Sequence, residues 1–416
     1  MPFLAFEGPA GTGKTYQLIE EVRARAPELL GTEQRVLGLT FMHGSRRRLD
    51  ESFAIKAEIR GRGHAVTIDS FAAHVVRRWS PIAPAIPDFT QFDHVCNACG
   101  ALLERPEIAR WVSAAFPIVA IDEAQELKPC RLRIAQALSS STHMVVAADE
   151  FQCLDDQLDT GPFMEWFETG NMQRLNVVRR TGRQGLLNAG IALRAEQPPT
   201  DGVGLRIRYD FPAQVKFTIG HAMRAGTGTR AILVAPGSTA WANELIPQLA
   251  AGFHSPTQDV PPLPMAWDTG SAEEARKAAE GLCGPAEQVE SAELVRRIKA
   301  LPGAAVWLST VVFSVDMARR AHGVRFWMQP ELLALCGRKA NAHRAYGYSS
   351  QRGIGVMTIH AAKNRQFRDV VILWGPGVPG TADHQRRLLY NAITRAEHSC
   401  TVMVRTQQQL QQPPFT

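Results

Sequence analysis

The chain has 416 residues, 45% of them hydrophobic, which is enough to fill the cores of roughly two to four compact units. No run of about 18 uncharged apolar residues is present and the first strand-like run begins almost at once, so we expect a cytoplasmic protein with neither a membrane span nor a signal peptide. Lysine and arginine exceed aspartate and glutamate by 46 to 40, which is compatible with a polyanionic partner. The seven scattered cysteines suit reduced thiols.

The first motif is a glycine-rich loop at residues 8–15, which matches G-x-x-x-x-G-K-[ST] at every position. A short apolar run precedes it and a helix-like pattern follows, which is the strand–loop–helix context of a phosphate-binding loop. Glycines let backbone N–H groups surround phosphate oxygens, Lys14 adds a positive charge at the β- and γ-phosphates, and the Thr15 hydroxyl suits Mg²⁺. The residues expected to bind the nucleotide here are Gly8, Gly11, Thr12, Gly13, Lys14 and Thr15.

Apolar and β-branched runs alternate with helix-like patterns over the first third of the chain, which predicts a parallel sheet flanked by helices. We assign residues 1–174 to this first domain, with a small proline-punctuated insertion at about 72–116. Each predicted strand ends at a polar cluster, as expected where ligands lie beyond the carboxyl ends of strands. The predicted strands are 3–6, 36–41, 66–68, 118–121 and 144–148.

A second alternating block predicts another domain of the same α/β class over residues 175–416. Proline-rich turns and then helical sequence, for example 287–300, interrupt the β pattern from about 255 to 351, which predicts an inserted subdomain. The predicted strands of this domain are 175–178, 205–209, 231–235, 356–359, 370–374 and 400–404.

The apolar run 118–121 ends in two carboxylates, Asp122 and Glu123. Downstream of a phosphate-binding loop, the first acid of such a pair holds the Mg²⁺ shell, and the second orients and deprotonates the attacking water. We therefore expect Asp122 to join Thr15 as a metal ligand and Glu123 to be catalytic.

With these and further motifs, the chain resembles the superfamily 1 helicases of the UvrD/Rep type over nearly its whole length. In the first domain, LTFMH at 39–43, TIDSF at 67–71, DEAQ at 122–125 and ADEFQ at 148–152 resemble T-F-T-N, T-x-H-S-F, D-E-x-Q and G-D-x-x-Q. In the second, LNVVRRT at 175–181, MTIHAAK at 357–363 and RLLYNAITRA at 387–396 resemble L-x-x-N-Y-R-S, M-T-I-H-x-A-K and R-L-L-Y-V-A-L-T-R-A.

The resemblance implies two RecA-like P-loop domains that hydrolyse ATP with Mg²⁺ in the cleft between them and move 3′ to 5′ along single-stranded DNA. It implies that Gln152 reads the γ-phosphate, that Arg180 contacts phosphate, that Arg395 is the arginine finger and that Gln366 lies near the ribose. Such a finger raises phosphoryl-transfer rates by roughly 10³–10⁵, because it stabilises charge on the equatorial oxygens once the cleft closes. The residues that the resemblance places on the strand are Phe41, His43, Phe71, Thr358 and His360.

Several positions depart from the family pattern. Only seven residues precede Gly8, where the family carries a glutamine motif that reads adenine, so we expect other NTPs such as GTP or CTP to be hydrolysed nearly as well. Residues 153–158 read CLDDQL and lack the aromatic residues that stack on bases, a contact worth roughly 1–3 kcal/mol per base. Asp69, Asn364 and Gln366 replace the family's His, Gly and Glu.

Alternatives remain for single residues. By position alone, Phe41 and Phe71 are equally well explained as core aromatics, and His360 as a hydrogen-bonded core histidine. The arginines at 46–48 form either a solvated basic face or phosphate contacts. Cys96 and Cys99 form a C-x-x-C pair, but a structural zinc site normally needs four ligands and no second Cys/His pair lies nearby, so ordinary thiols are favoured.

Alternatives also remain for the whole chain. Missing aromatic residues and short insertions favour an NTP-switched regulatory ATPase subunit, with little unwinding of its own, that acts on a protein partner such as a nuclease in DNA repair or phage defence. RNA in place of DNA is a third alternative, because these motifs do not distinguish the two sugars.

Overall fold

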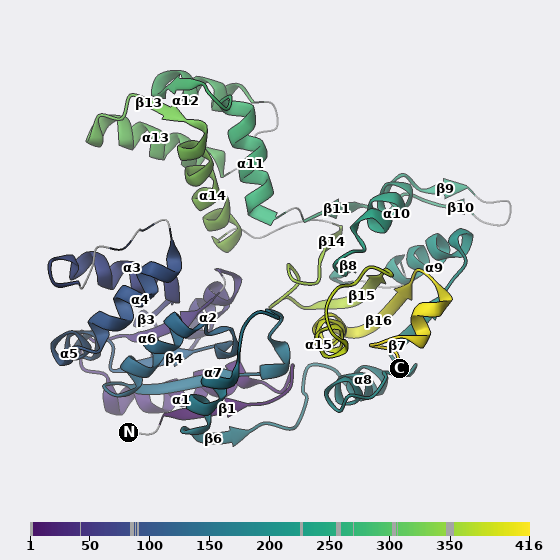
Figure 1. Cartoon of the computed structure of the whole chain (residues 1–416), viewed down its shortest axis with the longest axis horizontal. Helices are drawn as coiled ribbons and strands as arrows, with labels where there is room; N and C mark the ends of the chain where they lie inside the picture. Colours follow the sequence, from purple (N-terminus) through teal and green to yellow (C-terminus); the bar gives the residue numbers. More distant parts are fainter. Residues whose placement is uncertain are drawn as a thin grey trace. The chain divides into compact units, whose positions relative to one another are not determined.

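The computed structural model describes residues 3–41, 43–83, 87, 89, 91–224, 228–254, 259–268, 270–301, 305, 307–346 and 353–416. The chain divides into two compact units (Figure 1). The large unit comprises residues 1–266 and 351–416, and the small unit comprises residues 267–350. The large unit contains two sheets flanked by helices, which confirms the predicted α/β class.

The first sheet has the strand order β3-β2-β4-β5-β1-β6, with every neighbouring pair parallel. Its side chains alternate between two hydrophobic layers, as the period of a strand requires. In β4, for example, Ile118 and Ala120 face one layer while Val119 and Ile121 face the other. The strands are β1 Leu4–Glu7, β2 Val36–Thr40, β3 Gly63–Thr67, β4 Ile118–Ile121, β5 His143–Ala148 and β6 Asn171–Arg174.

Helices α1 (Lys14–Leu29) and α2 (His43–Ile55) supply one of these layers, and the other comes from a larger group of helices. Short 3-10 turns follow β4 and β5 and carry the residues after the strand ends; they are η2 Ala124–Glu126 and η3 Glu150–Gln152. The larger group comprises α3 Ile68–Arg78, α4 Phe92–Leu103, α5 Pro106–Ala115, α6 Pro129–Ser139 and α7 Gly161–Glu168, and the turn η1 Ser80–Ile82 follows α3.

The second sheet has the order β11-β14-β8-β15-β16-β7, and its pairs from β14 to β7 are parallel. Helices α8 (Gln184–Arg194) and α15 (Ala382–Ile393) pack on one face through a shared hydrophobic cluster, while α9 (Pro212–Arg224) contacts β15. The strands are β7 Leu205–Tyr209, β8 Arg230–Val234, β11 Met265–Trp267, β14 Ile354–Thr358, β15 Phe367–Trp374 and β16 Ala396–Val404. The remaining elements are α10 Thr239–Ala251, the hairpin of β9 Phe253–His254 with β10 Asp259–Val260, and η4 Gln407–Gln411.

The predicted strand at 175–178 is wrong. The last strand of the first sheet is β6, which ends at Arg174 and pairs with β1. Beyond it the Leu175 N–H donates to the Glu7 carbonyl over 2.8 Å, and the Arg179 N–H donates to the Gly11 carbonyl over 2.8 Å. The segment is therefore irregular because it follows the phosphate-binding loop rather than a strand.

The small unit has its own hydrophobic core, which includes buried Leu294, Trp307, Val311 and Cys336. The helix predicted at 287–300 begins only at Ser291, because residues 288–290 form a strand. The elements of this unit are α11 Gly270–Leu282, β12 Gln288–Glu290, α12 Ser291–Ala300, α13 Leu308–His322, β13 Phe326–Met328 and α14 Gln329–Tyr346, with β12 and β13 antiparallel.

None of the described helices is both long and apolar enough to cross a membrane. The boundaries at 1–174 and 175–416, with insertions at 72–116 and 255–351, stay predictions.

Candidate nucleotide-binding site

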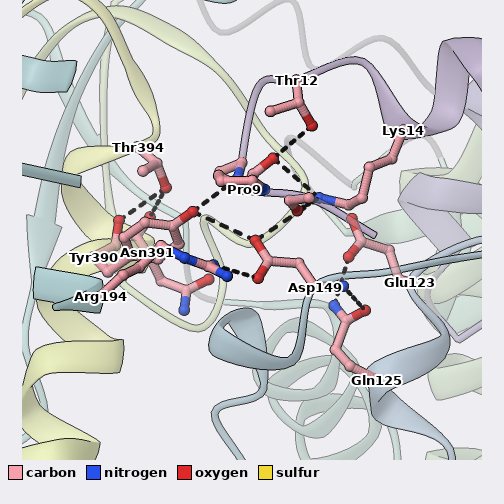
Figure 2. Close-up of polar contacts among 12 residues, drawn as sticks. Pro9, Thr12, Lys14, Glu123, Gln125, Asp149, Arg194, Tyr390, Asn391 and Thr394 are labelled. Carbon is pink, nitrogen blue, oxygen red and sulfur yellow. Dashed lines mark hydrogen bonds and ion pairs between the residues drawn. The ribbon is translucent and has the colours of Figure 1, made fainter. Parts of the chain in front are cut away.

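The phosphate-binding loop lies between β1 and α1, and its two central glycines have left-handed backbone, with φ of 82° at Gly11 and 90° at Gly13. Glycine adopts this conformation without steric cost. Lys14, the first residue of α1, is buried and points back across the loop, as Figure 2 shows. Its Nζ donates to the carbonyls of Gly8 over 2.7 Å and Pro9 over 3.2 Å. The lysine charge is therefore held at the loop that would surround a phosphate.

The two predicted metal ligands contact each other. Thr15 Oγ1 donates to Asp122 Oδ2 over 2.9 Å, because the end of β4 lies opposite the start of α1. Burial, together with the neighbouring Glu123 carboxylate, raises the pKa of Asp122 to about 6. A hydroxyl and a carboxylate form an oxygen-only donor set, which fits Mg²⁺. Thr15 and Asp122 are thus the residues that would hold it.

Glu123 has a left-handed backbone, with φ of 59°, which is uncommon for a residue other than glycine. Gln125 Nε2 donates to Glu123 Oε2 over 2.7 Å, and Gln125 Oε1 accepts from the Asp149 N–H over 3.0 Å. Burial alone raises the pKa of Glu123, but Lys14, the Gln125 hydrogen bond, Lys363 and Arg395 outweigh it and hold that pKa below its ordinary value. Gln125 therefore fixes an ionised Glu123 to the end of β5.

Asp149, at the end of β5, is the centre of a buried network with only 1% of its surface exposed. Arg194 Nη1 of α8 donates to Asp149 Oδ1 over 2.6 Å, and the Tyr390 hydroxyl of α15 donates to Oδ2 over 3.4 Å (Figure 2). The same hydroxyl accepts from the Ala10 N–H of the phosphate-binding loop over 2.7 Å. The guanidinium of Arg194 also stacks over the Tyr390 ring. This network joins the phosphate-binding loop and the end of β5 to α8 and α15, the two helices that pack on the second sheet.

Sequence reasoning missed this network. Arg194 lies in a helix that matches no motif, so nothing in the sequence points to it. Tyr390 lies inside the quoted motif RLLYNAITRA, five residues before Arg395, and that position could have been considered. Burial and the nearby Asp149 raise the pKa of Tyr390, which keeps its hydroxyl protonated.

The two predicted arginines of the second domain are held by backbone carbonyls. Arg180 Nη1 donates to the Thr394 carbonyl over 2.8 Å, and Arg395 Nε donates to the Asn391 carbonyl over 2.9 Å. Arg395 is buried, and burial together with the neighbouring charge of Arg180 lowers its pKa to about 10. The bond from Arg180 to the Thr394 carbonyl places the two arginines together, and Arg180 also lies against the phosphate-binding loop, where a Cβ at Gly11 would come within 2.7 Å of its Cβ.

Gln366 is exposed and contacts Arg180. With its amide oriented to satisfy both neighbours, the Gln366 oxygen accepts from Arg180 Nη2 over 3.1 Å and Nε over 3.3 Å, and its nitrogen donates to Glu397 Oε1 over 3.0 Å. Gln366 therefore orients the guanidinium group of Arg180. The predicted ribose contact stays a prediction.

Two further contacts connect the turn after β14 with the first sheet. Lys363 forms an ion pair with Glu126 of η2, and Asn364 Nδ2 donates to Ser45 Oγ of α2 over 2.7 Å. Asn364 has a left-handed backbone with φ of 64°, and asparagine tolerates that conformation best after glycine. The replacement of the family's glycine by Asn364 is thereby explained.

The residues predicted on a nucleic-acid strand lie in different environments. Phe71 is only 6% exposed and belongs to the first hydrophobic core, which fits the alternative of a core aromatic, and its contact with a strand stays a prediction. Phe41 is partly buried against the same core. Thr358 is exposed at the end of β14, and His360 is exposed two residues beyond it. The exposure of His360 does not fit the alternative of a hydrogen-bonded core histidine. His43 begins α2, but its side chain lies outside the described residues.

Gln152 lies buried in η3, close along the chain to Asp149, and its predicted contact with the γ-phosphate stays a prediction. Asp69, which replaces the family's histidine, accepts from Arg131 Nε over 2.8 Å. Cys96 and Cys99 are buried in α4, and within the described ranges no three His, Cys, Asp or Glu side chains gather as a metal site.

Comparisons with known proteins agree with the motifs of the second domain. Residues 353–403 match the model of the UvrD-like helicase C-terminal domain, a span that includes Lys363, Tyr390 and Arg395. Curated protein sequences yield no significant match. Two solved structures of arterivirus nonstructural protein 10 (helicase), one alone and one in complex with DNA, align with TM-scores of 0.40.

These two structures are 10% and 11% identical in sequence to the chain and cover 99% and 98% of it, respectively. The chain covers 62% of each arterivirus protein and is thus shorter than two thirds of its length. Over residues 353–403, the family model therefore matches the part of the chain where the second-domain motifs predict a resemblance to UvrD-like helicases.

Proposed function

We propose that the chain is an ATP-dependent DNA translocase or helicase of the UvrD/Rep type, which hydrolyses NTP with Mg²⁺ and moves 3′ to 5′ along single-stranded DNA. The observation that carries this proposal is the convergence of two sets of groups. Lys14 and the bonded pair Thr15–Asp122 lie beyond the ends of β1 and β4 of the first sheet, while Arg180 and Arg395 are bonded to carbonyls at the end of α15, which packs on the second sheet.

Each of these groups has a defined task in phosphoryl transfer. Amides of the loop and Lys14 bind the phosphates, and Thr15 and Asp122 would hold an Mg²⁺ ion, which would neutralise charge on the phosphate oxygens. Glu123, kept ionised and oriented by Gln125, accepts a proton from the attacking water. Arg180 and Arg395 stabilise the charge of the transferred group.

The network around Asp149 supports coupling between hydrolysis and movement. The Ala10 N–H of the phosphate-binding loop is bonded to Tyr390, and Tyr390 shares Asp149 with Arg194 of α8. Any rearrangement of the loop around a phosphate therefore acts on contacts between the two sheets. Because those contacts are buried and hydrogen bonded, the energy of nucleotide binding can shift the second sheet against the first.

The second candidate is the NTP-switched regulatory ATPase. Phe71 belongs to the core, and the segment after Gln152 has buried Cys153 and Leu154 where base-stacking rings would be expected. Both observations reduce the aromatic surface available to a strand, and they favour a protein that uses nucleotide to change a partner's state.

One set of assays separates the two. NTP hydrolysis is measured with and without single-stranded DNA or RNA, alongside displacement of a labelled strand from duplexes with a 3′ or a 5′ overhang. Stimulation by DNA and displacement only from the 3′ overhang support the helicase, whereas hydrolysis indifferent to nucleic acid supports the switch. The variant Lys14→Ala is the control, since it should abolish hydrolysis under either function.

A further inference from the structure

A cavity of about 740 Å³ lies on one face of the second sheet. Helices α8 and α15 pack on the opposite face. The cavity is bounded by α9, by the edge strand β7, by residues 368–369 of β15 and by residues 398–401 of β16. Its volume falls within the range of about 300–1,000 Å³ that is typical of ligand sites. None of its lining residues belongs to the candidate nucleotide-binding site.

The cavity is basic because the side chains of β7 alternate between the two faces of the sheet and its arginines lie on the cavity side. Leu205, Ile207 and Tyr209 face the hydrophobic cluster shared with α8 and α15, so Arg206 and Arg208 point to the opposite face. In the neighbouring strand β16, Thr401 pairs with Arg206 and lines the same cavity. A sheet face beside a helix is usually apolar, and here its edge carries arginines instead. The arginines that line the cavity are Arg183, Arg206, Arg208, Arg224 and Arg368.

The nearby carboxylates of Asp210 and Asp369 already form hydrogen bonds with neighbouring side chains. Asp210 accepts from Arg208 Nε over 2.7 Å and from the Thr218 hydroxyl. Asp369 accepts from Ser399 Oγ over 2.5 Å and contacts His398 Nδ1 at 3.3 Å. Within the described ranges, Arg183 and Arg206 have no ion-pair partner, so the cavity keeps an excess of positive charge. A cleft lined by one sign of charge attracts ligands of the opposite sign.

The distribution of the cations indicates a ligand with several phosphates. Arg206 on β7 is level with Val371 on β15, so Arg368 lies two strand spacings and three residues away, or about 14 Å along the sheet. Cations spread over this distance match the spacing of several linked phosphates better than a single phosphate. A guanidinium group matches a phosphate in geometry, because it can donate two parallel N–H hydrogen bonds to two phosphate oxygens.

We propose that this cavity is a second nucleic-acid site, which binds the phosphodiester backbone of a strand through Arg206 and Arg183. It lies outside the cleft and binds the strand independently of NTP. The contacts are with phosphates, so the site takes any base sequence.

The test is the salt dependence of binding of fluorescein-labelled oligo(dT), followed by anisotropy without NTP. Each lost phosphate contact reduces the slope of log affinity against log salt by about 0.7 for a single strand. Arg206→Gln should weaken binding roughly threefold to tenfold and lower the slope by the amount expected for one lost contact. The double variant Arg183→Gln/Arg206→Gln should lower the slope by the amount expected for two lost contacts. Arg206→Lys keeps the charge and should restore most of the slope.

The matched control is Arg110→Gln, which removes the same charge from α5, where the side chain is 75% exposed. The proposal is overturned if the double variant binds oligo(dT) with the affinity and slope of this control. It is also overturned if inorganic tripolyphosphate binds the Lys14→Ala chain in an Arg206-dependent manner while oligo(dT) does not, because the site would then serve a free polyphosphate. Since DNA binding is measured directly, a chain that hydrolyses no NTP would refute the helicase proposal and leave this one intact.

Discussion

At the scale of single residues, the hydroxyl of Tyr390 is the atom through which the two sheets share a hydrogen bond at the phosphate-binding loop. Tyr390→Phe keeps the ring, which packs edge-on against Phe151, but leaves the Ala10 N–H without its acceptor. We expect the free energy of unfolding to fall by about 1–3 kcal/mol, the cost of an unsatisfied buried donor. Urea unfolding followed by circular dichroism measures this change.

The matched control is Tyr209→Phe, because Tyr209 packs against the same hydrophobic cluster but is only partly buried. Equal stability of the two variants would mean that the Tyr390 hydroxyl contributes nothing to holding the sheets together.

Gln125 is a positioning residue in the proposed mechanism, since its side chain bonds Glu123 and the Asp149 N–H. Gln125→Ala should lower kcat of NTP hydrolysis at least about tenfold while changing KM little, because the catalytic carboxylate loses its orientation and phosphate binding is unaffected. Steady-state kinetics of this variant are compared with those of Gln136→Ala, an exposed glutamine on α6. A rise in KM with unchanged kcat would contradict the positioning role.

At the scale of elements, the turn after β14 carries Asn364 in a left-handed conformation while its side chain bonds Ser45 of α2. Asn364→Gly and Asn364→Ala both lose that bond, so the difference between them isolates the backbone. The alanine variant should be less stable than the glycine variant by about 1–2 kcal/mol, the cost of a left-handed residue with a Cβ. Chemical denaturation measures the difference, and an alanine variant as stable as the glycine variant would contradict this account.

Elements whose signals are local could be predicted from the sequence. The strand–loop–helix at residues 4–29 and the strand ending in Asp122 and Glu123 depend on neighbours along the chain, and both occur as expected. The strand expected at 175–178 failed because this run follows the phosphate-binding loop, a contact between distant residues. Phe71 fits both a strand contact and a core aromatic, and only the packing of helices around it shows that it is buried. Arg194 has no local signal because Asp149 and Tyr390, which it contacts, come from other elements.

At the scale of the whole molecule, the small unit has a core of its own, and the two ends of the large unit between which its sequence falls lie close together. The Ile354 N–H at the start of β14 donates to the Pro264 carbonyl just before β11, over 2.7 Å. The chain therefore leaves the second sheet and returns to it at one place. Separate cores and a close pair of connections are features of an inserted unit that folds on its own.

Replacing residues 268–350 by a short Gly/Ser linker should leave the large unit folded. We expect one cooperative melting transition within about 4 °C of that of the same unit in the full chain, because the hydrophobic clusters around both sheets are retained. Hydrolysis of NTP should persist and should still be abolished by Lys14→Ala, since Lys14, Asp122, Glu123, Arg180 and Arg395 all lie outside the deleted segment. Differential scanning calorimetry measures the melting transition, and an NTPase assay measures hydrolysis.

An insoluble product, or the absence of a cooperative transition, would show that the sheets depend on the small unit. If hydrolysis survives but strand displacement is lost, the inserted unit is required for work on the duplex rather than for chemistry.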